Sequence, residues 1–232
     1  MKPIATIQTP FPSNYGVPRQ PALAPAAEGR ITLPQNLAGA VDGLEGCSHV
    51  WLIWSFHLVP EGRGRNKVRP PRLGGNTRIG VFATRSPFRP NPIGLSVCRL
   101  LRIERDGGQA TLVLGGVDLV DGTPIYDIKP YVAYVDSVPD ATVDWVPGAP
   151  ALCPVRWTEQ AEADLRERGD GALRELIDQV LAQDPRPPTH KADHRADGRD
   201  VDRDYGTALR EVDVRWRYDS GIVWVLGISP PP

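Results

Sequence analysis

The sequence is poor in cysteine and has no apolar run of the length that crosses a membrane. Its three cysteines, Cys47, Cys98 and Cys153, are odd in number and widely spaced. They predict neither a disulfide framework nor a paired metal site, and a reducing compartment is the expected setting. The first residues also lack the apolar segment of a signal peptide. We therefore expect a soluble, cytoplasmic protein with no membrane partner.

Common nucleotide and hydrolase motifs are missing as well. The chain has no GxGxxG, no Walker loop, no HExxH and no GxSxG. These absences argue against the commonest dinucleotide-binding, phosphoryl-transfer, zinc-hydrolase and serine-hydrolase classes. His190 and His194 lie four residues apart, but their segment is rich in aspartate and typical of a solvated loop. No metal site is predicted.

Acidic residues are almost absent from one part of the chain. From Arg63 to Arg105 there are eleven lysines and arginines and a single acid, Glu104, although the formal net charge of the whole chain is −1. Prolines and glycines crowd the same stretch and predict stiff loops that present guanidinium groups. A single arginine is often paired with an acid or laid over apolar surface. Several in rigid loops with few acids nearby indicate an anionic ligand, and the arginines concerned are Arg19, Arg72, Arg85 and Arg89.

Short strands are expected to dominate the first part of the chain. Alternating or continuous apolar segments are separated by turn signals, of which the Asp-Gly-Gly after Arg105 predicts a hairpin. One short helix is expected over 34–44. This pattern indicates an all-β barrel or sandwich rather than a doubly wound sheet. The expected strands cover 4–8, 31–33, a buried run at 49–57, 78–83, 93–104, 110–114, the start of 117–124, and 125–128.

The pattern changes after the proline-rich stretch 139–154, which we interpret as a domain linker. Thr158 is placed to cap a helix, and Gly169 and Gly171 to break it. A second helix is predicted by one apolar stripe, and 190–204 reads as a charged surface loop. A hairpin is predicted from 212–216 and 222–228. The stripe consists of Leu173, Leu176, Ile177, Val180 and Leu181.

Some candidate functional residues have two interpretations. His57 follows an apolar run, so it either faces a site at the strand end or is a core histidine. Asp118, Asp121, Asp127 and Lys129 cluster around one turn, and an Asx turn explains Asp121 before Gly122 without chemistry. Aromatic residues divide by their neighbours. Trp51, Trp54 and Phe56 are expected in the core, whereas Tyr126, Tyr131 and Tyr134 stand beside Lys129 and are candidates for base stacking.

Eight segments spread over nearly the whole chain resemble the TsaA-like, or TrmO, family of S-adenosylmethionine-dependent tRNA methyltransferases. The block from ATRS to NPIG is the most specific of them. The segments are 16–21 (GVPRQP), 48–52 (SHVWL), 68–75 (VRPPRLGG), 80–94 (GVFATRSPFRPNPIG), 118–124 (DLVDGTP), 127–131 (DIKPY), 182–187 (AQDPRP) and 214–216 (VRW).

The resemblance implies a mainly β fold, with a small β-barrel domain over 1–145 and a smaller α+β domain over 151–232. It implies S-adenosylmethionine as the cofactor, held without a Rossmann glycine motif and without a metal. The implied reaction is methylation of N6 of threonylcarbamoyl-adenosine, next to the anticodon of threonine tRNAs. A homodimer is implied, with the cofactor near the subunit interface and the C-terminal domain assisting tRNA recognition.

Site residues are carried over by position. The cofactor-binding residues implied are Arg19, Gln20, Pro21, His57, Leu58, Arg85, Leu95, Gly115, Gly116, Val117 and Asp118. The residues implied to engage tRNA or its modified base are Lys129, Tyr131, Asp184 and Arg186. Two segments depart from the family pattern and concern the tRNA-binding surface: the charge-rich 190–204, and 207–211, which lacks an expected aromatic residue.

The implied reaction requires only weak acid or base catalysis by the protein. The N6–H of threonylcarbamoyl-adenosine lies between a purine and a carbonyl, which raise its acidity, so the main tasks are alignment and removal of a proton. We expect Arg19 or Arg85 to bind the cofactor carboxylate and Asp118 or a main-chain group its amine or sugar. Asp121 is the candidate proton acceptor or water-orienting group. Lys129 or Arg186 is the candidate cation for the threonyl carboxylate.

Two other functions fit the same residues. A non-catalytic RNA-binding β-barrel would use the arginines for phosphates and the tyrosines for stacking. A methyltransferase of the same fold would act on a different substrate. The first would bind tRNA and have no affinity for S-adenosylmethionine, which separates it from both methyltransferase readings.

Overall fold

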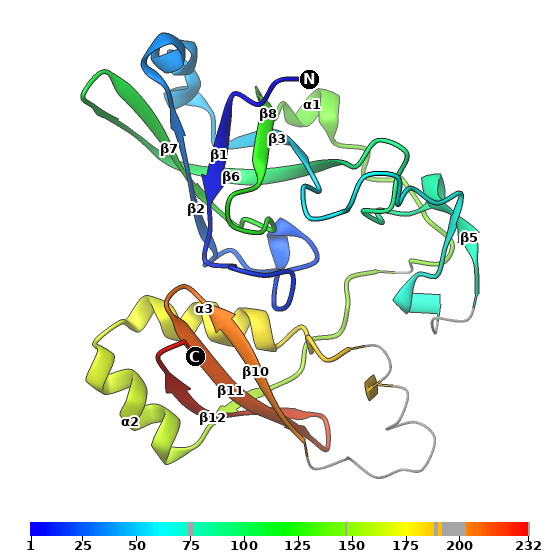
Figure 1. The fold of residues 1–232 in the computed structure, drawn as a ribbon, viewed down its shortest axis with the longest axis vertical. Helices are drawn as coiled ribbons and strands as arrows, with labels where there is room; N and C mark the ends of the chain where they lie inside the picture. Colours follow the sequence, from blue (N-terminus) through cyan, green and yellow to red (C-terminus); the bar gives the residue numbers. More distant parts are fainter. Residues whose placement is uncertain (74–76, 147, 188–189, 192–202, 232) are drawn as a thin grey trace. The chain divides into compact units, whose positions relative to one another are not determined.

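The protein is described here by a computed structural model, which covers residues 1–73, 77–146, 148–187, 190–191 and 203–231 (Figure 1). Most of the predicted charged loop 190–204 lies outside this range. The chain divides into two compact units. The first unit consists of Met1–Gln8, Gly29–Gly115 and Gly122–Ala149, and the second of Thr9–Glu28, Gly116–Asp121 and Pro150–Pro232. Two segments from the N-terminal half therefore belong to the unit formed by the C-terminal half.

A closed β-barrel forms the first unit, which confirms the predicted fold class. Its strands follow the order β1-β2-β7-β6-β3-β8 around the barrel, and every neighbouring pair described in register is antiparallel. The strands are β1 (Ala5–Gln8), β2 (Glu28–Leu33), β3 (His49–Ser55), β6 (Ile93–Asp106), β7 (Gln109–Gly115) and β8 (Pro124–Pro130).

Side chains alternate between the inside and the outside of the barrel. Val50 and Leu52 of β3 are fully buried, while the residues between them are partly exposed. The buried strand expected at 49–57 is therefore buried on one face only, and its apolar outward residues lie on the outer surface of the barrel. The inward side chains that complete the core include Ile7, Ile31, Cys98, Leu112, Leu114 and Ile125.

The predicted hairpin after Arg105 is confirmed. β6 and β7 are joined through Gly107 and Gly108, both with positive φ, as the common two-residue hairpin turn requires. The predicted strand at the start of 117–124 is wrong. Its backbone groups bond to a neighbouring loop instead of a sheet: Val117 N–H donates to the Ala27 carbonyl and Asp121 N–H to that of Phe11.

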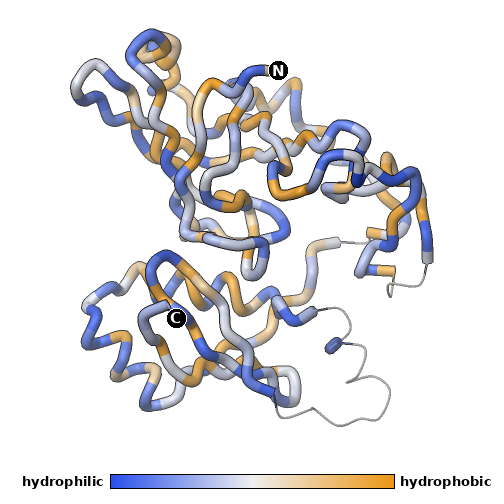
Figure 2. The backbone as a smooth tube through the Cα atoms, viewed as in Figure 1, coloured by the Kyte–Doolittle hydropathy of each residue, from blue (hydrophilic) through white to orange (hydrophobic). Residues whose placement is uncertain are grey.

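The chain leaves the barrel between β3 and β6 and returns after a long excursion, residues 56–92 (Figure 1). Among its described residues the excursion forms two short strands, β4 (Lys67–Val68) and β5 (Ile79–Gly80), because proline and glycine interrupt the longer runs. A 3-10 turn at Val81–Ala83 replaces the second half of the predicted strand 78–83. Figure 2 shows strongly hydrophilic stretches alternating with short hydrophobic ones along this excursion.

Helical structure in the first unit is short. The predicted helix over 34–44 is replaced by two 3-10 segments, Gln35–Val41 and Leu44–Gly46, because Gly43 between them adopts a left-handed conformation with φ 92°. α1 (Ala133–Asp136) is a single turn that follows β8. In the described part of the chain no helix is both long and apolar enough to cross a membrane.

The second unit contains an α+β layer, as predicted. Its sheet has the order β10-β11-β12-β9, in which β9 (Val155–Trp157) is parallel to β12. β11 (Val212–Asp219) and β12 (Ile222–Ser229) form the predicted hairpin. β9 and β10 (Asp204–Leu209) were not predicted, because each is short and one begins inside the charged segment.

Two capped helices pack with this sheet. Thr158 accepts a hydrogen bond from Ala161 N–H and begins α2 (Glu159–Arg168), as predicted. Asp170 caps α3 (Gly171–Leu181) in the same way through Leu173 N–H. All five residues of the predicted apolar stripe are buried in α3.

Candidate functional site

The first loop, residues 9–27, connects β1 to β2 and carries Arg19, Gln20 and Pro21. Gly16 has φ +89°, and a Cβ there would lie 2.6 Å from Cγ2 of Thr207, so only glycine allows the loop to pass this close to β10. The Arg19 side chain is exposed, and among the residues that the structure describes no acid lies within ion-pair distance of it. Its guanidinium is available to an anion.

Two glutamines of the C-terminal half hold the backbone of this loop. Gln179 Oε1, in α3, accepts a hydrogen bond of 2.8 Å from Ala26 N–H. One turn later Gln183 accepts from Arg19 N–H at 3.4 Å and donates to the Leu23 carbonyl at 3.4 Å. The loop that presents Arg19 to Pro21 is therefore bonded to a helix far away in the sequence.

The segment Gly116–Asp118 lies against the same loop. Val117 N–H donates to the Ala27 carbonyl at 3.1 Å. Gly116 has φ +69°, and a Cβ there would lie 2.9 Å from the Pro21 carbonyl oxygen. Any side chain at position 116 would be strained and would also push the two main chains apart. The second unit thus brings six of the implied cofactor residues into two adjoining segments, 19–21 and 116–118.

The remaining implied cofactor residues belong to the first unit. His57 lies two residues beyond the end of β3, is exposed, and has its Nδ1 3.4 Å from Oγ1 of Thr123. Leu58 and Leu95 are 50% and 49% exposed, which is unusual for leucine and leaves apolar surface available to a ligand or partner. Arg85 is exposed in the excursion, and Gly115 ends β7.

A small cluster of aromatic rings and one cation covers the outer surface of β3 and β8. Tyr131 lies 5.8 Å from Trp51 and 6.5 Å from His49, measured between ring centroids. Lys129, opposite Trp51 in the register, is 61% exposed and pairs with Asp127 at 3.1 Å. Contrary to expectation, Trp51 is not in the core; the alternation of β3 places it outside.

Asp184 and Arg186 form a nearly buried ion pair. Arg186 donates two hydrogen bonds to Asp184, of 2.8 and 3.0 Å, and its guanidinium carbon lies 3.3 Å from the centre of the Tyr218 ring. Lys191 Nζ lies 3.0 Å from the same carboxylate. The Arg186 side chain is only 8% exposed. Its charge is therefore used mainly inside the protein.

Burial and charge pairing act in opposite directions on the ionisable groups of this cluster. Burial disfavours ionisation of Asp184, but its bonds to Arg186 and Lys191 outweigh this effect and hold its pKa below the usual value. Burial lowers the pKa of Lys191 although the same carboxylate opposes the shift. Burial, followed by the neighbouring Tyr205 and Asp184, raises the pKa of Tyr15 to about 12. Tyr15 is therefore protonated at neutral pH, and its buried hydroxyl has no hydrogen-bond partner among the described residues.

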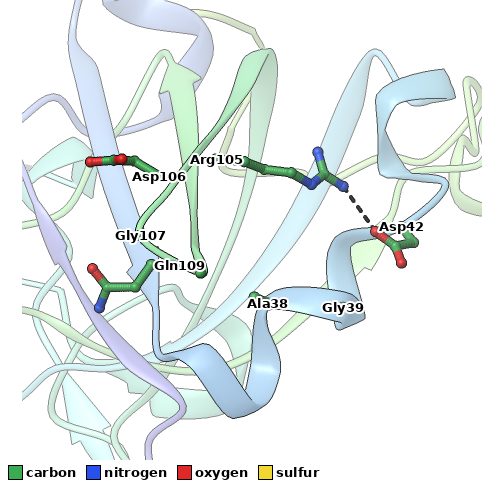
Figure 3. Close-up of a pocket in the computed structure, with 8 residues that line it drawn as sticks. Ala38, Gly39, Asp42, Arg105, Asp106, Gly107 and Gln109 are labelled. Carbon is green, nitrogen blue, oxygen red and sulfur yellow. Dashed lines mark hydrogen bonds and ion pairs between the residues drawn. The ribbon is translucent and has the colours of Figure 1, made fainter.

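A surface pocket lies elsewhere, at the tip of the β6–β7 hairpin, and contains none of the residues implied by the resemblance (Figure 3). Arg105 crosses it toward Asp42 at 2.9 Å and also pairs with Glu45 at 2.7 Å. Because these acids already neutralise the arginine, the pocket offers no unpaired cation for an anionic ligand. Its lining consists of Ala38, Gly39, Asp42, Arg105, Asp106, Gly107, Gly108 and Gln109.

Sequence patterns missed the residues that support the site. The apolar stripe of α3 does not indicate that Gln179 contacts the first loop. Gln183 lies in the family-like segment 182–187, but the sequence alone does not indicate its contact with the loop. Tyr15 gave no signal either. Within the described residues, no group of three or more His, Cys, Asp or Glu side chains is arranged to hold a metal ion.

Comparisons with known proteins cover both halves of the chain. Residues 6–137 match the family model described as the tRNA-methyltransferase O N-terminal domain. Residues 150–231 match the TrmO C-terminal domain.

Relatives and solved structures match at nearly full length. A tRNA (adenine(37)-N6)-methyltransferase of Escherichia coli (strain K12) is 44% identical, with 98% of this chain and 96% of that protein covered. A putative S-adenosylmethionine-dependent methyltransferase, RcsF, of Pseudomonas aeruginosa is 46% identical over 94% of this chain and 92% of its own length. A crystal structure of TrmO from Pseudomonas aeruginosa superposes with a TM-score of 0.75, at 40% identity, over 99% of this chain and 95% of that one.

Proposed function

Since the chain belongs to the tRNA-methyltransferase O family, we infer that it is an enzyme that methylates N6 of adenine 37 in tRNA, with S-adenosylmethionine as methyl donor. One observation carries this conclusion: the relatives that bear this activity in their names match both halves of the chain rather than a shared barrel alone. The absence of a Rossmann glycine motif is consistent with a barrel that holds its cofactor in another way.

We propose that the first loop and the segment Gly116–Asp118 contact S-adenosylmethionine. The residues present fit such a group. Arg19 offers a carboxylate a guanidinium that no described acid pairs with, and Asp118 offers an amine its carboxyl group. The close approach at Gly116 provides main-chain atoms where a Cβ would intrude. The cofactor supplies an electrophilic methyl group on a sulfonium, so the protein's part is to hold the acceptor nitrogen in line.

We propose further that the acceptor adenine carries a threonylcarbamoyl group. The flanking carbonyl makes N6–H more acidic, and a modest base is then enough. Lys129 is the accessible cation for the threonyl carboxylate, and it stands beside the rings of Trp51 and Tyr131, which can pack on a base. Arg186, buried against Asp184, supports the surrounding structure instead.

Asp121 is proposed as the proton acceptor or as the group that orients a water. Its carboxylate is exposed and accepts a hydrogen bond of 2.8 Å from Thr9 N–H, which fixes one oxygen. The other oxygen is the candidate acceptor. Aspartate is a weak base, and only the raised acidity of the substrate N–H makes this role adequate.

We also propose a homodimer in the cytoplasm. The outer surface of β6 carries three large apolar side chains, Ile93, Leu95 and Leu101, that are 39 to 49% exposed. Exposed apolar side chains gathered on one strand favour a protein–protein interface there. Sedimentation of the purified protein measures its oligomeric state. The Leu101→Lys variant should shift the equilibrium from dimer toward monomer.

The experiment for the function is a transfer assay. Purified protein, tRNA from cells without this activity, and S-adenosylmethionine labelled in its methyl group are mixed, and label in the tRNA is counted. Label should enter tRNA, and Arg19→Ala should weaken cofactor binding in calorimetry by about tenfold or more. Unchanged affinity in both Arg19→Ala and Arg85→Ala would overturn the assignment of the carboxylate partner.

A further inference from the structure

The excursion between β3 and β6 carries a dense positive charge. From residue 63 to residue 89 the sequence has eight lysines and arginines and no acid. Sequence alone treats these residues alike. The structure separates those that hold the excursion together from those that face solvent.

Three of the arginines are engaged within the excursion and its surroundings. Arg89 donates hydrogen bonds to the carbonyls of Thr84, at 2.6 Å, and Val81, at 3.3 Å. Arg72 donates to the Gly148 carbonyl at 2.8 Å. Arg65 lies over the ring of Phe88, 5.9 Å from its centre. Arg72 and Arg89 satisfy main-chain acceptors, and all three side chains fix loops that proline has already stiffened.

Four others form what we name the cationic hairpin: Arg63, Lys67, Arg69 and Arg78. All four are exposed, and none of them has an acid within ion-pair distance among the described residues. The nearest acids in sequence are Glu61 before the hairpin and Glu104 far beyond it.

The strand pairing gathers these charges. β4 and β5 are antiparallel, with Lys67 opposite Gly80 and Val68 opposite Ile79. Arg69 directly follows the last residue of β4, and Arg78 directly precedes the first residue of β5. Both arginines therefore adjoin the last residue pair of the hairpin.

Like charges close together destabilise a strand pair, and an isolated two-stranded hairpin is already marginal. Since none of the described acids neutralises these cations, we expect their counter-charge to come from a ligand. Three guanidinium groups and one lysine spread over the hairpin suit a ligand with several phosphates better than a single small anion. The half-buried Val68 and Ile79 on the other face anchor the hairpin, leaving the charged face outward.

We propose that the cationic hairpin binds the phosphate backbone of the tRNA substrate and positions it without reading bases. This inference rests on the proposed function, since it takes RNA to be the substrate. Contacts of this type release counterions and contribute affinity that falls steeply with salt.

The test measures tRNA binding by fluorescence anisotropy over a range of potassium chloride concentrations. The full-length variant carries Arg63→Gln, Lys67→Gln, Arg69→Gln and Arg78→Gln. The slope of log K against log salt should become shallower by about 3, at roughly 0.7 to 0.9 per lost phosphate contact. KM for tRNA should rise, kcat at saturating tRNA should be kept, and affinity for S-adenosylmethionine should be unchanged. A variant with lysine at all four positions should restore the slope.

A matched control removes four exposed cations elsewhere. The control variant changes Lys2, Arg156, Arg166 and Arg168 to glutamine, which alters net charge equally. An equal loss of slope in both variants, or no loss in the hairpin variant, would overturn the proposal. A shift from dimer to monomer in sedimentation, with the slope unchanged, would assign the hairpin to a second copy of the chain and also overturn it. If the wild-type protein fails to methylate tRNA, the proposed function fails first, and the two results stay distinguishable.

Discussion

Lys129 and Arg186 are both candidates for the threonyl carboxylate, but they differ in how much of each side chain reaches solvent. Lys129 is 61% exposed and pairs with a carboxylate that is itself half exposed. Arg186 is 8% exposed and bonds to Asp184 through two nitrogens. An exposed pair contributes little to stability, whereas removing one partner of a buried pair leaves an uncompensated charge.

These contacts predict opposite effects for two substitutions. Lys129→Ala should leave the free energy of unfolding within about 0.5 kcal/mol of wild type and reduce methylation of tRNA. Arg186→Ala should lower the free energy of unfolding by about 3 kcal/mol, because Asp184 remains buried. Urea unfolding and the transfer assay measure the two effects. Full activity in both variants would remove both residues from recognition of the carboxylate.

Asp184 also predicts a pH dependence. Its pKa in the folded protein lies below the unfolded value of about 3.9, so its contribution to stability is fully present above that value. That contribution is lost as the pH falls through the folded-state pKa. Asp184→Asn, which tolerates the positive φ of 49° at this position, should therefore be less stable than wild type at pH 7 and converge with it in acid. A gap in unfolding free energy that stays constant with pH would contradict this.

Among the elements, α3 has a role that its amphipathic pattern did not reveal. Its apolar stripe predicted packing correctly, while the polar side chains of Gln179 on α3 and of Gln183, two residues after its end, hold the backbone of the first loop. Gln179→Met keeps size but leaves Ala26 N–H without this acceptor, and buried donors left unpaired cost about 1 to 3 kcal/mol. The first loop should then populate the conformation that presents Arg19 less often.

We therefore expect Gln179→Met and Gln183→Met to weaken S-adenosylmethionine binding by about tenfold, measured by calorimetry without tRNA. The matched control is Gln160→Met on α2, an exposed glutamine bonded only to its own helix in the structure described. Unchanged cofactor affinity in the Gln179→Met and Gln183→Met variants would show that the first loop keeps its geometry without these two hydrogen-bonding side chains.

The approach of the first loop to Gly116 makes a second prediction at this scale. Gly116→Ala should greatly reduce cofactor affinity, since the new Cβ meets the Pro21 carbonyl and the backbone has φ +69°. The control is Gly169→Ala. Gly169 has almost the same φ, +65°, but no atom lies within 4 Å of the position that a Cβ would take. That control should show only the strain of about 1 to 2 kcal/mol in thermal unfolding, with affinity kept. Equal losses of affinity would refute a steric role for Gly116.

For the whole molecule, the sequence pattern predicted those features that depend on residues close together in the chain. The hairpin at Gly107 and Gly108, the cap at Thr158 and the stripe of α3 depend on neighbouring residues and were predicted. The outward position of Trp51 was not, because it depends on barrel closure rather than on the composition of β3.

The supporting parts of the candidate site were not predictable for a related reason. The bonds from Gln179 to Ala26 and from Val117 to Ala27 join segments far apart in sequence, and single-residue types do not encode such partners. The cofactor residues came from family resemblance. The distinction between engaged and solvent-facing arginines needed the distances around Arg89 and its neighbours.

The most direct measurement is mass spectrometry of nuclease fragments of threonine tRNA before and after incubation with the purified protein and S-adenosylmethionine. Fragments that contain adenine 37 should gain a methyl group on threonylcarbamoyl-adenosine, and unmodified adenine 37 should react poorly. A methyl group at any other nucleotide, or none in the presence of tight tRNA binding, would contradict the function proposed here.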